Sequence, residues 1–435
     1  MRKDICKLIP TVAMVVAIAF VTIIVTGYAK AQTYTILHTF TGPDGADPAA
    51  AMIGDFAGNL YGATYYGGNG NLCGGTVGCG TVFKLSSSGV ETLLYTFSGG
   101  ADGALPEGLF RDSAGNLYGV TGHGGNLSLC NVLGYPPGCG VIFKLSPPAT
   151  FCRSVMCPWR ETVLHTFTGP DGALPIGSLV QDSAGTFYGV TVGGGTDDNG
   201  TVFELNSAGQ ESVLLSFMYD APGGSLPLAG LVQDSAGMLY GTTHYGGTGG
   251  YGVVYKLDPT TGQETVLYSF RGVDDGAYPN GPLIFDQAAN IYGSTEWGGF
   301  FQGEGQDCYA GCGVIYKLDA NGDENVLYTF TGGADGWWPS EELTRDTAGN
   351  LYGITFYGGN EQVHGCNPGG CGTIFKLDAN GNKTVLHAFD STDGAYPGTG
   401  LVQDTAGNLY GATSAGGEGS CQIIGGCGVV FKITP

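Results

Sequence analysis

The chain has 435 residues, of which 81 are glycine, and only 12% are charged although 42% are hydrophobic. Glycine at about 19%, against ~7% in average proteins, has no three-residue period here and occurs with 24 Tyr and 21 Phe, which excludes collagen and ordinary disorder. The net charge of −22 is spread along the chain and argues against binding to nucleic acid or to anionic membranes.

The N-terminal segment, residues 1–31, differs from the rest of the chain. It has a basic start with Arg2 and Lys3, an apolar run over 11–27, and an A-x-A cleavage motif that ends at Ala31. This order predicts a signal peptide. The alternative is an uncleaved membrane anchor, because the apolar run is long for a signal peptide. In both cases we expect the remainder to be exported, to the periplasm, the cell surface or the extracellular space, with no further membrane segment.

A unit of four short segments recurs seven times after residue 32. Each segment has four to seven residues, mostly β-branched, aliphatic or aromatic, and is bounded by Gly, Asn, Asp or Pro, which is typical of β-strands. Tight polar turns join the first segment to the second and the third to the fourth, which predicts hairpins. The second segment always contains a tyrosine followed by glycine, at Tyr61, Tyr118, Tyr188, Tyr240, Tyr292, Tyr352 and Tyr410.

Four antiparallel strands repeated seven times predict an all-β, seven-bladed β-propeller, because stacking around an axis covers both faces of every blade. The chain ends indicate how the ring closes. Residues 34–40 resemble a fourth strand, whereas the last segment, 429–433, resembles a third strand. We therefore expect strand 34–40 to complete the last blade and leave no blade short of its edge strand. Residues 32–435 then form a single domain, which we expect to be a monomer.

The recurring pattern D-x-A-G-N-L-Y-G-x-T-x-x-G-G, then C-G-T-V-F-K-L-D, then T-V-L-Y-T-F resembles the GloVer tandem repeat of exported bacterial proteins. The resemblance covers essentially the whole chain after residue 33. It implies an exported repeat protein and brings no established activity with it. The hairpin pattern D-x-x-G-N-x-Y is also similar, more weakly, to NHL and lactonase-type propellers.

Twelve of the thirteen cysteines lie after the N-terminal segment, in six local pairs. Five pairs occupy loops between second and third strands, and the two repeats without a pair have the shortest such loops. This correlation predicts disulfides that staple long loops in an oxidising compartment. Zinc binding is the alternative, but a tetrahedral site needs four ligands, and only His364 lies near a pair. The predicted disulfides join Cys73 to Cys79, Cys130 to Cys139, Cys152 to Cys157, Cys308 to Cys312, Cys366 to Cys371 and Cys421 to Cys427.

Aromatic residues concentrate on one face of the predicted propeller, where the loops between second and third strands and the loops between blades emerge. Exposed rings beside polar side chains suit carbohydrate, because sugar rings stack on aromatic faces and sugar hydroxyls form hydrogen bonds. The alternative is that these rings pack between blades. The candidate ligand-binding residues are Tyr65, Tyr66, His244, Tyr245, Trp297, Trp337, Trp338, Phe356 and Tyr357.

Acidic residues offer weaker indications of chemistry. The two most deviant repeats hold candidates for a carboxylate pair of the kind used in glycoside cleavage, with solvated loop acids as the alternative. Aspartates recur at two positions of the repeat, in the inter-blade theme D-G-A-x-P and in the first hairpin. We expect both sets to cap turns. The candidate catalytic residues are Glu296, Glu341, Glu342 and Arg345.

No cofactor and no metal site is predicted from the sequence. Segments at Asp319 and Asp197 begin like calcium loops but lack the later acidic ligands, so they are weak candidates. His38, His165 and His387 share one position in the fourth strand, where sister repeats carry Tyr, and they indicate no site by themselves.

These patterns favour a binding module over an enzyme. Glycan is the leading ligand class, and another surface protein is the alternative partner. A lactonase-type or glycan-cleaving enzyme with acids around the channel mouth is the second hypothesis. A structural protein of the cell surface or matrix is the third.

Overall fold

The computed structural model divides the chain into two units, Met1–Ala31 and Gln32–Pro435. The predicted signal peptide lies outside the described residues, as do Glu341, Cys152 and Cys157. No helix among the described residues is long and apolar enough to cross a membrane. The structure describes residues 32–48, 51–68, 73, 78–131, 135–148, 158–219, 222–299, 308, 310–339, 342–360, 366, 369–417, 421 and 425–434.

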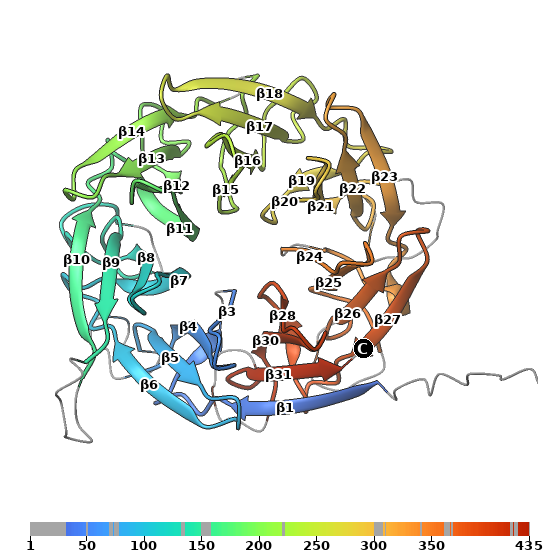
Figure 1. Ribbon diagram of the computed structural model, residues 1–435, viewed down its shortest axis with the longest axis horizontal. Helices are drawn as coiled ribbons and strands as arrows, with labels where there is room; N and C mark the ends of the chain where they lie inside the picture. Colours follow the sequence, from blue (N-terminus) through green and yellow to red (C-terminus); the bar gives the residue numbers. More distant parts are fainter. Residues whose placement is uncertain are drawn as a thin grey trace, which may run out of the picture. The chain divides into compact units, whose positions relative to one another are not determined.

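Seven antiparallel sheets follow one another around a ring in chain order (Figure 1), which confirms the predicted seven-bladed β-propeller. Blade 1 consists of β2 (Ala46–Pro48), β3 (Ile53–Gly54), β4 (Leu60–Tyr66), β5 (Thr81–Leu85) and β6 (Glu91–Thr96). Blade 2 consists of β7 (Ala104–Arg111), β8 (Leu117–His123), β9 (Val141–Ser146) and β10 (Arg160–Thr166). Blade 3 consists of β11 (Ala173–Gln181), β12 (Phe187–Gly193), β13 (Thr201–Leu205) and β14 (Glu211–Ser216).

The remaining blades repeat this order, from the channel outward. Blade 4 consists of β15 (Val232–Gln233), β16 (Leu239–Thr243), β17 (Val253–Asp258) and β18 (Gln263–Ser269), and blade 5 of β19 (Ala277–Pro279), β20 (Ile284–Phe285), β21 (Ile291–Trp297), β22 (Val314–Leu318) and β23 (Glu324–Thr329). Blade 6 consists of β24 (Thr344–Arg345), β25 (Leu351–Thr355), β26 (Thr373–Leu377) and β27 (Lys383–Ala388). Blade 7 consists of β28 (Ala395–Pro397), β29 (Val402–Gln403), β30 (Leu409–Ala415), β31 (Val429–Thr434) and β1 (Thr33–Thr39).

The ring closes as predicted. Strand β1 pairs antiparallel with β31, from Thr33 opposite Thr434 to Thr39 opposite Val429, and so forms the outer edge of blade 7. Figure 1 shows the two strands side by side, although they come from opposite ends of the chain. Every blade therefore has its fourth strand.

The innermost strand is less regular than the pattern predicts. In blades 1, 5 and 7 it is divided into two short strands that both pair with the second strand. In blades 4 and 6 one half of this pairing is reduced to single bridges, Ser225 to Tyr245 and Trp337 to Tyr357. Where the residues after the proline are described, the pairing with the second strand is interrupted, between Pro106 and Leu109 in blade 2 and between Ile176 and Val180 in blade 3.

The core of each blade comes from the repeated positions. The third strand buries nearly all its apolar side chains, as with Val82, Phe83 and Leu85, and the final Phe of the fourth strand is buried in every repeat. The Gly after the repeated Tyr allows this packing, because a Cβ on Gly62 would lie 2.6 Å from Cζ of Phe83. Equivalent contacts recur around the ring, so the Tyr-Gly pattern is a packing requirement.

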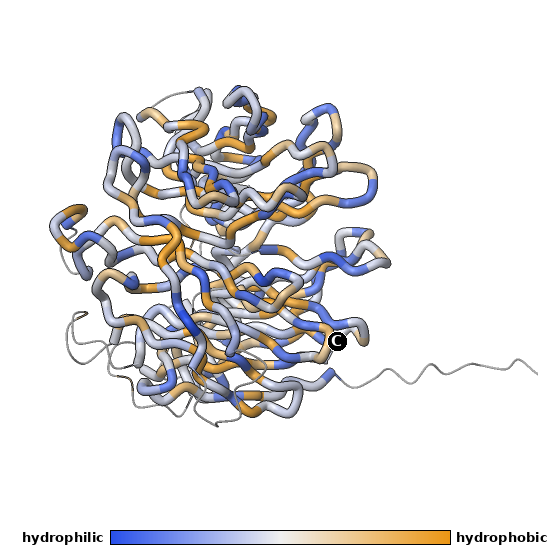
Figure 2. The backbone as a smooth tube through the Cα atoms, turned by 60° about the vertical axis from the view of Figure 1, so that its left-hand side comes forward, coloured by the Kyte–Doolittle hydropathy of each residue, from blue (hydrophilic) through white to orange (hydrophobic). Residues whose placement is uncertain are grey.

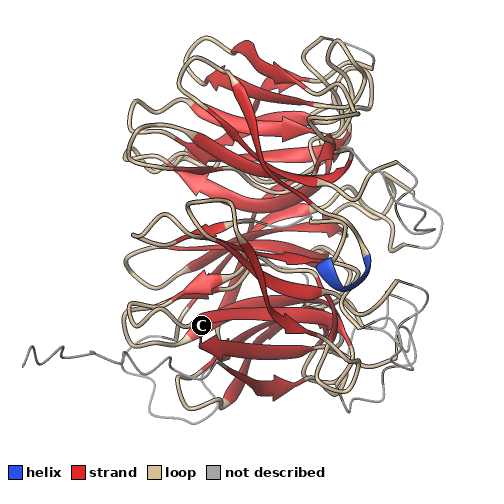
Figure 3. Cartoon of the chain, turned by 90° about the vertical axis from the view of Figure 1, so that its right-hand side faces the viewer, coloured by secondary structure: helices blue, strands red, loops and turns tan. Residues whose placement is uncertain are grey.

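Figure 3 shows the strands running between two faces of the ring, with the single 3-10 turn of the described chain, η1 (Gly333–Asp335), on one of them. We call this the loop face; it carries the inter-blade D-G-A-x-P loops and the loops between second and third strands. In Figure 2, apolar stretches run along the strands and hydrophilic stretches mark many of the turns. The tight hairpins lie at the opposite face.

Candidate functional site

The residue before the proline of the D-G-A-x-P theme adopts the left-handed region in all seven blades, with φ between 54° and 61°. None of the seven is glycine, so each carries local strain of about 1 kcal/mol or more, which the surrounding structure must hold. We call them the mouth residues. In chain order they are Asp47, Leu105, Leu174, Leu226, Tyr278, Trp338 and Tyr396.

A hydrogen bond to the preceding blade accompanies this strained conformation. Each mouth residue donates its backbone N–H to a carbonyl just before the third strand of the previous blade, at 2.8 to 3.2 Å. In two junctions the acceptor is Asn199 or Tyr251, and in the other five it is the second cysteine of a predicted pair. The inter-blade contact therefore explains why the left-handed conformation persists. The five acceptor cysteines are Cys79, Cys139, Cys312, Cys371 and Cys427.

Five of the six predicted disulfides are formed, with Cα–Cα distances of 5.0 to 5.3 Å. The sixth prediction, Cys152 with Cys157, falls on residues outside the described part of the chain and stays a prediction. The formed disulfides join Cys73 to Cys79, Cys130 to Cys139, Cys308 to Cys312, Cys366 to Cys371 and Cys421 to Cys427.

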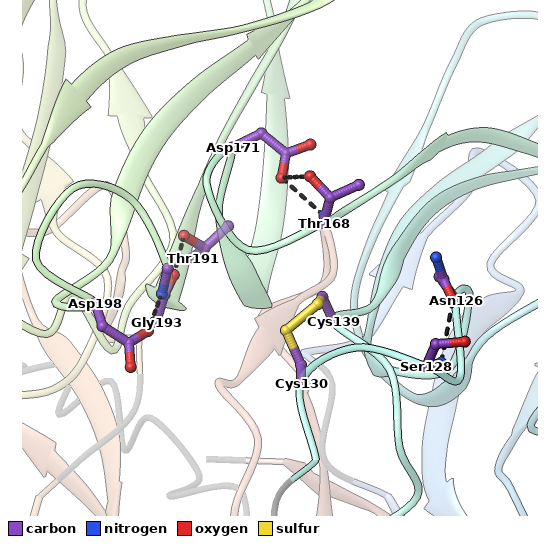
Figure 4. The surroundings of a disulfide bond; sticks show 10 residues. Asn126, Ser128, Cys130, Cys139, Thr168, Asp171, Thr191, Gly193 and Asp198 are labelled. Atoms are coloured by element: carbon purple, nitrogen blue, oxygen red, sulfur yellow. Dashed lines mark hydrogen bonds between the residues drawn. A yellow bond between two sulfur atoms is a disulfide. The ribbon is translucent and has the colours of Figure 1, made fainter.

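The disulfides lie at the blade junctions. Figure 4 shows Cys130 and Cys139 beside the loop of the next blade, where Thr168 bonds Asp171. Because the second cysteine also supplies the inter-blade carbonyl, each disulfide fixes an acceptor for the neighbouring blade. Five disulfides also mark the folded chain as an exported protein, made for an oxidising compartment.

The aromatic residues of blades 5 to 7 form one group, which we call the tryptophan cluster: Trp297, Trp337, Trp338, Phe356, Tyr357 and Tyr396. Its rings meet within and across blade junctions. Trp337 stacks on Tyr357 with centroids 4.4 Å apart, Phe356 stacks on Tyr396 at 5.4 Å, and Trp297 lies 5.9 Å from Trp338. Much of this contact is packing between blades, which the sequence analysis gave as the alternative to ligand binding.

Exposure separates the members of the cluster. Trp337 is buried, with 9% of its surface accessible, whereas the other five rings are half-buried. Trp337 therefore packs the loop, and the others present part of their surface at the loop face. The sequence placed Trp337 and Trp338 together as candidates, and burial distinguishes them.

Glu296 lies beneath this cluster rather than in solvent. Its side chain accepts a hydrogen bond from Asn280 Nδ2 at 2.6 Å and is also bonded by the side chains of Trp338 and Trp297. Only 6% of the residue is exposed, and burial raises the pKa of its carboxyl to about 7. Glu296 thus holds the tryptophan side chains in place, a role that the sequence did not assign.

Blades 4 and 5 meet through a second aromatic group. His244 stacks on Tyr278 at 4.9 Å, and Tyr245 meets both rings edge to face. Tyr245 is 43% exposed. Burial lowers the pKa of His244 to about 4, so the imidazole is neutral at physiological pH. This group presents one exposed phenol to the loop face.

Residues of blades 1 to 3 line an open pocket of about 190 Å³ at the loop face. Tyr65 and Glu107 line it together with His123 and Tyr135, whose rings are parallel at 5.2 Å. Tyr65 donates a hydrogen bond to Glu107. Glu107 retains some surface exposure, yet burial of its carboxyl raises the pKa to about 8. Tyr66, a sequence candidate, packs edge to face on Tyr65.

Glu107 was missed by sequence reasoning, although a signal existed. It follows the proline of D-G-A-x-P, where sister repeats carry Ile176, Leu228, Asn280 or Gly398. An acid at a position that is otherwise uncharged marks a deviation inside a regular repeat. It lines a second cavity of about 350 Å³, formed by the innermost strands and also lined by Asn280 and Glu342.

The described catalytic candidates occupy three different environments. Glu296 lies under the tryptophan cluster, Glu342 lines the channel cavity, and Arg345 lies over the ring of Tyr292 at 5.6 Å. Glu341 lies outside the described residues. Glu342 shares a cavity wall with Glu107, and Glu296 is not among the residues that line that cavity.

The recurrent aspartates act in turns, as expected. Asp55 accepts hydrogen bonds from the backbone of Ala57 and Asn59 and from the hydroxyl of Tyr61. Asp319, a weak calcium candidate, accepts two backbone N–H groups inside its hairpin. The other candidate segment caps its own loop in the same way, through a bond from Gly194 N–H to Asp198.

The fold and the loop face together define a disulfide-stapled β-propeller repeat protein. The chain belongs to the Gloeobacter/Verrucomicrobia repeat family, whose model matches residues 23–156, 74–306 and 304–435. This confirms the resemblance that the repeats indicated. No curated protein matches the sequence.

Solved structures with a similar fold differ widely in sequence. Virginiamycin B lyase from Staphylococcus aureus is 13% identical with a TM-score of 0.57, over 93% of this chain and 99% of that one. The extracellular domain of a hybrid two-component system from B. thetaiotaomicron is 10% identical with a TM-score of 0.54, over 92% and 39% of the two chains. A protein described as a gluconolactonase is 12% identical over 93% and 92%, with a TM-score of 0.41. The first two likenesses concern the fold.

Proposed function

We propose that this protein is a binding module that recognises glycan at the tryptophan cluster of its loop face. One observation carries the proposal: five half-buried aromatic rings from three consecutive blades adjoin one another beside the amide of Asn280 and the carboxyl of Glu296. Aromatic surface next to fixed polar groups suits a sugar, which has an apolar C–H face and hydroxyls at its edge.

Trp338 is the central ring of this proposed site. It contacts Trp297, Phe356 and Tyr357, and its backbone is locked to Cys312 of the previous blade. The bond between its side chain and Glu296 restricts the indole further. A ring that is already ordered loses little conformational entropy when it binds, which favours affinity from a small contact area.

A glycan array, supplemented with pull-downs on insoluble polysaccharides, tests the proposal. We expect the wild-type protein to retain one class of glycan and Trp338→Ala to weaken that binding at least tenfold. Leu226→Ala is the matched control, because Leu226 occupies the same strained position in blade 4 and lies outside the cluster. Binding by Trp338→Ala at wild-type strength, or no retained glycan in any format, contradicts the proposal.

A second candidate is hydrolysis in the channel, favoured by the two carboxylic acids, Glu107 and Glu342, that line one cavity of about 350 Å³. Burial raises the pKa of both, which is the condition for a general acid near neutral pH. A screen of lactones and aryl glycosides against wild type, Glu107→Gln and Glu342→Gln separates the two candidates. Turnover that either variant abolishes supports hydrolysis; no turnover by wild type removes this candidate and leaves the glycan proposal untouched.

A further inference from the structure

Three potential metal ligands meet at the outer rim, where blades 2 and 3 adjoin. His165 comes from β10, Asp171 from the loop before β11, and Glu211 from the start of β14. His165 Nε2 lies 3.0 Å from Asp171 Oδ2 and 4.0 Å from Glu211 Oε2. One ligand atom from each residue falls within 4.8 Å of the others, and no other group of three in the described part of the chain meets this condition.

Asp171 is anchored so that one carboxylate oxygen faces this rim group. Its Oδ1 accepts hydrogen bonds from the backbone N–H and the hydroxyl of Thr168 (Figure 4), and these bonds measure 2.8 and 2.9 Å. Its Oδ2 points to His165 instead. The carboxylate is therefore oriented by the turn before any ligand arrives.

Glu211 contributes a buried carboxyl group to this cluster, as the equivalent glutamates of sister blades do at their own junctions: Glu91, Glu161, Glu264 and Glu324 each bury one oxygen that has no described partner. The side chain of Glu211 is only 8% exposed, and its Oε1 is buried with no hydrogen-bond partner among the described residues. A carboxylate withdrawn from water beside a second carboxylate costs free energy unless a positive charge compensates it. His165 alone does not satisfy both oxygens of Glu211.

At two other blade junctions a basic side chain lies beside the recurrent aspartate. The position of Glu211 is occupied in blade 6 by Lys383, whose ammonium lies 2.8 Å from Oδ1 of Asp335, the counterpart of Asp171. In blade 5 the aspartate Asp275 pairs with Arg271 at 3.0 Å. At these two junctions a positive charge lies beside the recurrent aspartate, from the rim position itself in blade 6 and from the inter-blade loop in blade 5.

We propose that His165, Asp171 and Glu211 bind a divalent transition-metal cation of the zinc class. One imidazole nitrogen and two carboxylates suit Zn²⁺, whereas Ca²⁺ prefers oxygen ligands alone. Tetrahedral zinc with ligand distances of about 2.0–2.1 Å separates its ligands by roughly 3.3 Å. The observed 3.0 and 4.0 Å need only small side-chain shifts to reach that value.

Metal binding at Nε2 of His165 breaks its hydrogen bond with Asp171 Oδ2 and requires the neutral imidazole to carry its single proton on Nδ1. Water completes the coordination, because His165 and Asp171 each keep about a fifth of their side chain exposed. Since the ligands come from two blades, the bound cation links β10 and β14 across their junction.

Two other rim junctions with histidine provide internal comparisons. His38, Asp44 and Glu91 are the same residue types, and Glu91 also buries an oxygen without a described partner, but their ligand atoms do not gather within the same distance. At the junction of blades 6 and 7, the acid is replaced by Tyr34, which stacks on the histidine ring at 3.8 Å. The gathering of all three ligands distinguishes the junction at Glu211, so we expect one high-affinity site per chain.

Isothermal titration of Zn²⁺ into the purified, chelator-treated full chain tests this inference. Reductant is omitted, because thiols released from the disulfides would bind zinc themselves. We expect one equivalent bound with micromolar affinity and a thermal midpoint that rises by several degrees with saturating zinc. Glu211→Gln weakens binding at least tenfold. Glu161→Gln, the same rim position beside Tyr95 instead of histidine, leaves binding unchanged.

Glu211→Lys keeps the test decisive should the glutamine variant fold poorly. By analogy with Lys383, the new ammonium pairs with Asp171, so this variant should keep the metal-free thermal midpoint and lose its response to zinc. Wild-type protein that binds no zinc below about 1 mM overturns the proposal. Zinc binding by both Glu211 variants at wild-type strength, or preference for Ca²⁺ over Zn²⁺, overturns it as well.

Discussion

Single carboxyl groups in this ring are held close to their neutral form by burial. Glu296 has a pKa raised to about 7 and Glu107 a pKa raised to about 8, with burial as the main cause in both. For Glu296 the hydrogen bonds from Asn280 and the tryptophans oppose the effect of burial without cancelling it. Protonation of such groups therefore contributes to stability.

Replacing Glu296 by glutamine should flatten part of the pH dependence of stability. The folded pKa, about 7, lies above the unfolded value near 4.5, so this group stabilises the fold fully below about pH 4.5 and loses that contribution as the pH rises through 7. We expect Glu296→Gln to gain stability relative to wild type between pH 5 and 8, by at most about 3 kcal/mol. Urea unfolding at several pH values measures this. Parallel stability profiles for the two proteins contradict it.

At the scale of elements, each blade joint combines a strained mouth residue with a carbonyl from the blade before it. The acceptor carbonyl belongs to a disulfide cysteine in five of seven joints. A disulfide that closes a loop of five to ten residues adds about 2–3 kcal/mol through chain entropy. Its position next to the acceptor means that the same bond also orders the mouth residue of the next blade. Each of these disulfides therefore closes a loop within one blade and also orders the contact with the next blade.

Replacing Cys308 and Cys312 by serine should disturb the tryptophan cluster as well as lower stability. The loss should be about 2 kcal/mol, and tryptophan fluorescence should shift to longer wavelength, because Cys312 accepts the backbone N–H of Trp338. The same change at Cys130 and Cys139 is the matched control, since the mouth residue there is a leucine. We expect a similar loss of stability with unchanged fluorescence. Identical spectra for both variants would show that the two roles are separate.

The sequence predicted the four-strand unit, the seven blades and the closing strand, because repeated apolar positions and turn residues specify strands locally. It did not predict the division of the innermost strand, whose pairing with the second strand is interrupted after the proline in the described repeats. It also could not separate Trp337 from Trp338, because nothing in the sequence of two consecutive tryptophans indicates which side chain is buried. Glu107 deviates from the sister repeats in the sequence itself, but the residues that surround it, and the group of His165, Asp171 and Glu211, come together only across blade junctions.

At the scale of the whole molecule, the ring depends on a strand that is distant in sequence from its partner. Strand β1 contributes Tyr34 against His387 of blade 6 and Phe40 against Phe83 of blade 1, at 3.8 and 5.2 Å. Strand β1 makes these contacts without a direct chain connection to β31, whereas every other fourth strand follows the third strand of its own blade in sequence. The glycine-rich turns recur in all seven repeats, so the blades have similar structures. Pairing of β1 with β31 then closes the ring.

Phe40→Ala should therefore destabilise the protein as much as the same change inside a continuous blade. Phe40 is fully buried and its N–H bonds Gly428, just as Phe270 is fully buried and bonds Gly252. Each truncation should cost about 3–5 kcal/mol. Urea unfolding of Phe40→Ala and Phe270→Ala measures the two losses, and deletion of residues 34–40 should cost more than either because it leaves β31 as an unpaired edge. A loss below about 1 kcal/mol for Phe40→Ala alone would mean that β1 is docked only loosely and that the other blades hold the ring without it.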